Sequence, residues 1–142
     1  MIRLLRSFAS LSSRHRVLVL RAAAWLLVSR AALAVFSLSF LLRSWARIPA
    51  RPADVTYASA AECELAVARA SRVISMRCLA QALAGAALLR RERRPATLTI
   101  HVGFDEAHRF EAHALLRSDS VVVTGAGPAT SWPVVLRADL AQ

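Results

Sequence analysis

The chain has 142 residues, of which 56% are hydrophobic, and it carries 19 arginines and no lysine against 9 acidic residues. This length fits one domain, or a small domain with an appendage, and excludes a large multidomain enzyme, whereas the apolar content excludes intrinsic disorder. The charge is uneven, because nine arginines precede Asp54, the first acidic residue, whereas the rest of the chain is nearly neutral. We expect no nucleic-acid partner, since the sequence has no Cys/His finger and no aromatic-studded basic strand.

Residues 17–42 are almost wholly apolar and long enough to cross a bilayer, but Arg21 and Arg30 interrupt them. An arginine at the membrane centre costs roughly 2.5–3.5 kcal/mol, so spanning is disfavoured. The same arginines break the apolar region that should precede the signal-peptidase-like residues 32–34, which favours a cytoplasmic protein. The two arginines lie on opposite sides of a straight helix, so two helices, or one long helix packed by a partner, fit best. A peripheral membrane contact stays open.

Prolines at residues 49 and 52 predict a linker over residues 48–54. We therefore divide the chain into a basic, apolar helical extension (residues 1–53) and a core (residues 54–142).

The core begins with helical signals. Ser59 and Glu62 have the capping-box spacing, which predicts a helix running to about residue 74. Ser75 can cap a second helix with Cys78 in its first turn, and arginines before Pro95 suit the end of that helix.

After Pro95 the hydrophobic period changes to two, which predicts an antiparallel meander of residues 96–103, 110–117 and 120–124 and a short edge strand over residues 133–136. A loop over residues 104–109 would pair Gly103 with Phe110 and Ile100 with His113. A two-residue turn at Ser118-Asp119 would pair Arg117 with Ser120 and His113 with Thr124. The fold class is thus α+β, with a helix packed on a small sheet.

The two cysteines, Cys63 and Cys78, match no zinc-ligand spacing and argue against a disulfide framework. Cys78 lies in the first turn of the predicted helix and beside Arg77, where the positive end of the helix and a neighbouring cation favour the thiolate that a nucleophile requires. The alternative is a small buried hydrophobe. Cys63 lies between two glutamates, which oppose a thiolate, and we interpret it as structural.

On the predicted pairing, His113 shares the apolar face of the sheet with its alternating hydrophobic residues, namely Leu98, Ile100, Val102 and Leu115. Small residues in the Cys78 helix, among them Gly85, allow a close approach to this face, so thiol and imidazole can meet. The alternative is a core histidine with a satisfied hydrogen bond. His101 points away from His113 on this pairing.

Four segments carry a resemblance to an enzyme family: Cys78-Leu79-Ala80-Gln81-Ala82-Leu83-Ala84, Leu88-Leu89-Arg90-Arg91, Pro95-Ala96-Thr97-Leu98-Thr99-Ile100-His101-Val102 and Phe110-Glu111-Ala112-His113-Ala114. They resemble the transglutaminase-like leader peptidases of lasso-peptide biosynthesis, which show a C-L-x-x-A-L-A helix, an L-L-R-R-R helix end, a P-A-x-L-x-I-G-V strand and an F-x-A-H-A-W strand. The resemblance covers roughly residues 17–137 and is most specific between Cys78 and Ala114.

The resemblance implies a papain/transglutaminase-type core and a cysteine peptidase that removes the leader from a ribosomally made precursor peptide. Cys78 would be the nucleophile and His113 its general base, with no cofactor and no metal. The implied partners are the precursor, a separate small leader-recognition protein and an ATP-dependent macrolactam cyclase that resembles asparagine synthetase. The chain resembles the split form of the family, in which the recognition domain is not fused at the front.

Two departures from the family pattern matter. Some relatives have an acidic third catalytic residue where this sequence has Thr124 and Gly125, so we expect Thr124 or a nearby backbone carbonyl to hold the imidazole. The family usually has glycine at the position of His101 and tryptophan at that of Leu115. Alternative functions are an inactive scaffold that delivers precursor to the cyclase, and a related acyl transferase.

Overall fold

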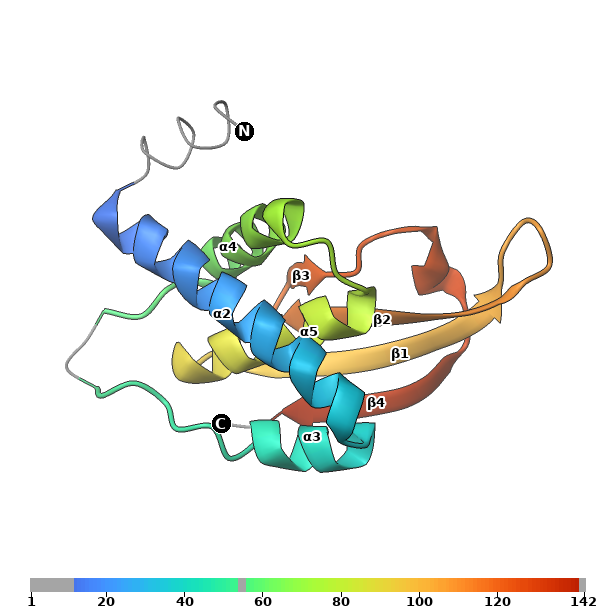
Figure 1. Ribbon diagram of the computed structural model, residues 1–142, viewed down its shortest axis with the longest axis horizontal. Helices are drawn as coiled ribbons and strands as arrows, with labels where there is room; N and C mark the ends of the chain where they lie inside the picture. Colours follow the sequence, from blue (N-terminus) through green and yellow to red (C-terminus); the bar gives the residue numbers. More distant parts are fainter. Residues whose placement is uncertain (1–11, 54–55, 141–142) are drawn as a thin grey trace.

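The computed structural model describes residues 12–53 and 56–140. Arg3, Arg6 and the linker residue Asp54 lie outside these ranges. Four helices and a four-stranded antiparallel sheet make up this part of the chain (Figure 1). The helices are α2 (Ser13–Val35), α3 (Leu38–Trp45), α4 (Ala60–Val73) and α5 (Cys78–Arg91). The strands are β1 (Ala96–Phe104), β2 (Phe110–Ser118), β3 (Val121–Thr124) and β4 (Val134–Leu140), with a 3-10 helix η1 (Pro128–Ser131) before β4. The predicted α+β class is confirmed.

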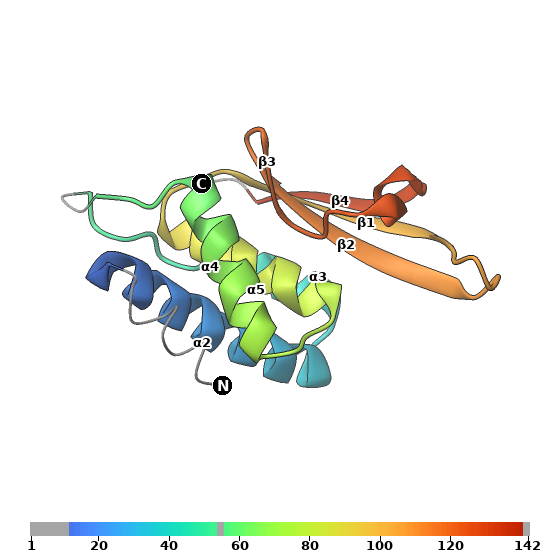
Figure 2. The ribbon, with the colours of Figure 1, turned by 90° about the horizontal axis from the view of Figure 1, so that it is seen from above.

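The sheet has the order β3-β2-β1-β4, and the helices cover one of its faces while η1 lies over the other (Figure 2). Helix α5 approaches the sheet closely at Gly85, where an added Cβ would lie 2.7 Å from Leu116 Cδ2. Leu116 and its partner Leu98 are fully buried between the layers. The small residues of α5 therefore permit the contact that the sequence indicated.

Residues 12–53, the described portion of the N-terminal part, form two helices, which is one of the two predicted arrangements. Leu18, Ala22, Leu26 and Ser29 of α2 are buried. In α3 the indole Nε1 of Trp45 donates to the Leu83 carbonyl at 2.8 Å. The division at residue 53 stays a prediction, and residues from both sides of it share one hydrophobic cluster.

The start of α4 agrees with the cap predicted from the sequence, whereas the start of α5 does not. The capping box of α4 is complete, since Glu62 N donates to Ser59 Oγ at 3.2 Å and Ser59 N donates to Glu62 Oε2 at 2.7 Å. The expected cap at Ser75 is wrong, because α5 begins at Cys78 with Arg77 as its N-cap and has no side-chain capping bond. Residues 74–77 form the connection that turns the chain from α4 into α5, so Ser75 is used there.

The register of the first hairpin differs from the prediction by one residue. Phe104 pairs with Phe110 and His101 with His113, around a loop over residues 105–109 in which Asp105 Oδ1 accepts from Arg109 N at 2.8 Å. A shift of one residue moves every side chain to the other face of the sheet. His113 is therefore not on the face that packs against the helices, and it lies on the opposite face with His101.

The second hairpin also differs from the prediction. Ser118 pairs with Val121 rather than leaving Arg117 opposite Ser120, and a bulge after Leu116 then sets Leu116 opposite Thr124. Thr124 is consequently not opposite His113. Strand β4 is an edge strand as predicted, and it is longer than the predicted residues 133–136.

Candidate active site

Cys78 is the first residue of α5, and its Sγ lies 3.9 Å from the carbonyl oxygen of Ala112. That carbonyl belongs to the peptide unit that joins Ala112 to His113. Ala112 pairs with Val102, whose N–H points away from β2 and donates to Pro133 O at 3.0 Å. In an antiparallel ladder the Ala112 carbonyl then points away from β1 as well, towards the edge of β2 that β3 leaves open. The thiol thus lies at this open edge.

The start of α5 also supplies hydrogen-bond donors. The first backbone bond of this helix runs from Gln81 N to Arg77 O at 3.2 Å. The amides of Cys78 and the next two residues therefore have no intrahelical acceptor, and they concentrate positive potential at the helix start. A developing oxyanion beside Cys78 would meet these donors.

His113 is held by a backbone carbonyl. Its Nε2 lies 2.7 Å from the oxygen of Gly125. A carbonyl oxygen only accepts, so Nε2 carries the hydrogen and Nδ1 of the neutral ring keeps its lone pair. Nδ1 has no hydrogen-bond partner among the described residues. The ring is therefore oriented so that Nδ1 is the available base.

Gly125 can place its carbonyl there because it is glycine. Its φ is +82°, and an added Cβ would collide with the carbonyl oxygen of Ala114. Thr124 Oγ1 is buried and has no hydrogen-bond partner in the described part of the chain. Of the two groups the sequence indicated for the imidazole, the structure thus shows the carbonyl. The glycines at residues 125 and 127 were the only sequence signal for it.

The prediction that thiol and imidazole face each other across the apolar side of the sheet is wrong. Cys78 reaches β2 from the helix layer, whereas the His113 side chain leaves β2 on the opposite face. Within the described ranges no hydrogen bond joins Cys78 to His113. What links the two residues is the contact of the thiol with the peptide unit that immediately precedes His113.

His101 does not point away from His113, as the sequence suggested, but pairs directly with it. Both ring nitrogens are engaged, Nδ1 with Trp132 O at 2.9 Å and Nε2 with Thr99 Oγ1 at 3.1 Å. Only 6% of the residue is exposed. His101 has no nitrogen left to act as a base, and its place in the structure is that of a buried histidine with satisfied hydrogen bonds.

Cys63 is fully buried in α4. Burial raises the pKa of its thiol from 9.0 to about 12, with further contributions from the charges of Glu92 and Glu62. The thiol is therefore protonated at neutral pH, which agrees with the structural interpretation of Cys63.

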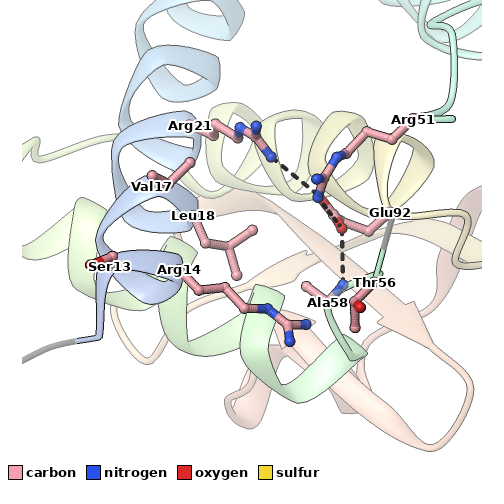
Figure 3. Close-up of a pocket in the computed structure, with 9 residues that line it drawn as sticks. All are labelled: Ser13, Arg14, Val17, Leu18, Arg21, Arg51, Thr56, Ala58 and Glu92. Atoms are coloured by element: carbon pink, nitrogen blue, oxygen red, sulfur yellow. Dashed lines mark hydrogen bonds and ion pairs between the residues drawn. The ribbon is translucent and has the colours of Figure 1, made fainter. Parts of the chain in front are cut away.

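A cleft of about 450 Å³ lies at the other end of α5 (Figure 3). Helix α5 has 14 residues, so this cleft and Cys78 are about 20 Å apart. The Glu92 side chain is fully buried there, with Arg51 Nη1 3.1 Å from both carboxylate oxygens, Ala58 N donating at 2.9 Å and Arg21 Nη1 3.6 Å away. This cluster fastens α2, Arg51 and Ala58 to the end of α5, and no sequence pattern indicated it.

A family model described as the transglutaminase-like superfamily matches residues 23–137. The chain belongs to the transglutaminase-like superfamily. This superfamily includes cysteine peptidases and acyl transferases, and its domains are commonly cysteine-dependent enzymes. The matched range contains Cys78, His113 and Gly125. Searches of curated proteins and of solved structures found no significant match to this chain.

Proposed function

We propose that this transglutaminase-like protein is a cysteine peptidase that removes the leader from a lasso precursor peptide, with Cys78 as nucleophile and His113 as general base. The observation that carries the proposal is the pairing of a helix-start thiol with the peptide unit of a histidine whose Nε2 is held by a carbonyl. That arrangement leaves Nδ1 available to take a proton, and it sets the thiol at an open sheet edge against the residue that precedes His113.

The first half of the reaction requires the Cys78 thiol and the His113 ring to come together around the open edge of β2, where the thiol gives its proton to Nδ1. The thiolate attacks the scissile carbonyl carbon, a C–S bond forms and the oxyanion accepts from the amides at the start of α5. The C–N bond then breaks, and the leaving amine takes the proton from Nδ1. The Gly125 carbonyl keeps Nε2–H in place and stabilises the imidazolium through the same hydrogen bond.

In the second half Nδ1 takes a proton from water, and the water oxygen attacks the thioester. The C–S bond breaks, the sulfur recovers the proton and the carboxylic acid of the cleaved leader leaves. If an amine takes the place of water, the product is an amide, which is the acyl-transferase alternative.

The proposed partners are the precursor peptide, a separate leader-recognition protein and an ATP-dependent macrolactam cyclase, with no cofactor for the cleavage itself. Recognition of the leader away from the scissile bond would position that bond at Cys78. Support for this part is the motif resemblance between Cys78 and Ala114.

The test is cleavage of the precursor by purified chain and recognition protein, followed by mass spectrometry. Cys78→Ala should abolish leader removal, and His113→Ala should be about as damaging, because the two residues act as one unit. Cys63→Ala is the matched control: it should retain turnover and lose only thermal stability, since it removes buried volume.

Three outcomes would contradict the proposal. Equal activity of Cys78→Ala and the wild type would remove Cys78 as the nucleophile. An amide product, whose mass differs from that of the hydrolysed leader by the mass of the amine less one water, would indicate acyl transfer. Absence of cleavage by the wild type, together with stimulated macrolactam formation from precursor already freed of its leader, would indicate a scaffold.

A further inference from the structure

The outward face of α2 is apolar along its whole length. Its exposed large side chains are Val17 (45%), Leu20 (60%), Leu27 (54%), Val28 (47%) and Val35 (75%). At about 100° per residue these positions fall on one side of the helix, opposite the buried Leu18, Ala22, Leu26 and Ser29. A helix on the surface of a soluble domain usually carries polar side chains there.

Helix α3 continues this face. Phe36 and Phe40 are 48% and 45% exposed, and their rings stack with centroids 4.9 Å apart. Arg43 and Arg47 follow at the same helical spacing and are also exposed. We call the outward side of α2 and α3, from Val17 to Arg47, the outer face.

Cationic side chains border this face and anionic ones are missing from it. On the helical wheel of α2, the exposed Arg30 lies on one flank of the apolar stripe. Arg14 and Arg21 lie on the other flank, where they reach Glu62 and Glu92, each at 3.6 Å. The described residues 12–53 contain no aspartate or glutamate. The face thus combines an apolar stripe with charge of a single sign.

No described residue of this chain covers the outer face. Helix α2 is the layer farthest from the sheet, and α3 lies at its end (Figures 1 and 2). By length and composition alone α2 could cross a membrane. Its opposite side is packed against α4 and α5, however, so crossing would uncover the core.

We propose that the outer face docks on an anionic lipid bilayer, with α2 lying parallel to the membrane plane. The apolar stripe would enter the boundary between headgroups and acyl chains, while the exposed Arg30, Arg43 and Arg47 reach lipid phosphates. A lipid surface fits better than a soluble protein, because Arg30, Arg43 and Arg47 present exposed positive charge on this face and an anionic leaflet attracts each such side chain near it. The docked orientation leaves the sheet, with Cys78 and His113, on the side away from the lipid.

The test is co-sedimentation of the full chain with vesicles of phosphatidylcholine alone and of phosphatidylcholine mixed equally with phosphatidylglycerol. Binding to the anionic vesicles is expected to be much stronger and to weaken with added salt. The double variant Leu20→Ser/Leu27→Ser should bind the anionic vesicles on the order of a hundredfold more weakly, because each buried leucine contributes on the order of tenfold. Arg30→Gln should cost about fivefold.

The matched control is Val134→Ser/Val135→Ser in β4, which removes two side chains of similar exposure (52% and 60%) away from the outer face and should bind as the wild type does. Cys78→Ala should also bind normally, which separates this proposal from the proposed peptidase activity. Equal binding to both vesicle types, or loss of binding in the β4 control, would overturn the proposal. So would a lipid-free dimer, by sedimentation, that the Leu20/Leu27 variant dissociates, since the face would then join two copies of this chain.

Discussion

At the scale of single residues, Gly125 contributes to the candidate site through its backbone, although it has no side chain. Its carbonyl fixes the tautomer of His113, and it does so from a φ of +82° that favours glycine. We expect Gly125→Ala to lower both melting temperature and turnover, because the new Cβ collides with the Ala114 carbonyl and displaces the acceptor. Gly127→Ala is the control, since nothing lies within 4 Å of a Cβ there. Equal turnover in the two variants would contradict this role of Gly125.

Substitution of the neighbouring Thr124 should have the opposite effect on stability from substitution of Gly125. Its hydroxyl is buried without a hydrogen-bond partner in the described structure, which costs free energy of folding. Thr124→Val should therefore leave the free energy of unfolding unchanged or slightly higher, and turnover should fall by a factor on the order of ten or less. Chemical denaturation and cleavage rates measure the two quantities. A drop in turnover comparable to that of His113→Ala would mean that the hydroxyl orients the ring.

Cys63 makes stability sensitive to alkaline pH. Its pKa is raised by burial from 9.0 in the unfolded chain to about 12 in the folded one. Between these values the unfolded state has lost the proton and the folded state keeps it, so stability falls as pH rises through this window. Because the chain has no lysine, few other groups titrate there. The gap in unfolding free energy between wild type and Cys63→Ala should shrink from neutral pH to about pH 10; a constant gap would contradict the shift.

At the scale of elements, the capping box fixes the start of α4. Ser59→Ala should lower the free energy of unfolding by about 1 kcal/mol, because Glu62 N loses its acceptor. Ser39→Ala, in the exposed first turn of α3, is the control and should change it by less than about 0.5 kcal/mol. The pKa of Glu62 lies below 4.5, first because Ser59 N donates to it. Its contribution is thus present above pH 4.5 and is lost as pH falls through the folded value.

The Glu92 cluster joins elements that are far apart in the sequence. Glu92→Gln should cost on the order of 2–3 kcal/mol, because it removes the buried charge that Arg51 and Ala58 N share. Arg21→Gln should cost less than about 1 kcal/mol, since Arg21 is partly exposed and 3.6 Å from the carboxylate. Urea denaturation measures both, with Glu106→Gln in the exposed hairpin loop as a control. A larger effect at Arg21 than at Glu92 would contradict the assignment of Glu92 as the centre.

At the scale of the whole molecule, a single hydrophobic cluster runs from α2 through α4 and α5 to the sheet. We therefore expect one cooperative unfolding transition. Two of the tryptophans, Trp25 and Trp45, lie in α2 and α3 with ring centroids 6.1 Å apart, so fluorescence reports chiefly on the N-terminal helices. Amide infrared absorption reports on the sheet. Coincident melts are expected; separate melts would mean that residues 1–53 form an independent unit.

Local sequence determined most of the secondary structure. The Ser59 to Glu62 spacing predicted the start of α4 because a capping box involves only residues three apart. The change of hydrophobic period after Pro95 predicted the strands, and the prolines predicted the break after α3. Cys78 was placed correctly in a first helical turn, because alanine and leucine extend the helix from there.

Tertiary structure decided which groups meet. The register of β1 and β2 depends on a loop closed by Asp105, and a difference of one residue moved His113 to the other face of the sheet. The bulge after Leu116 moved Thr124 away from His113 and left Gly125 to hold the ring. The Glu92 cluster joins residues more than 30 apart, and no local pattern encodes such contacts. Sequence thus named Cys78 and His113 as candidates, while long-range packing fixed their partners, since only the closed fold determines which backbone carbonyls and charges face each side chain.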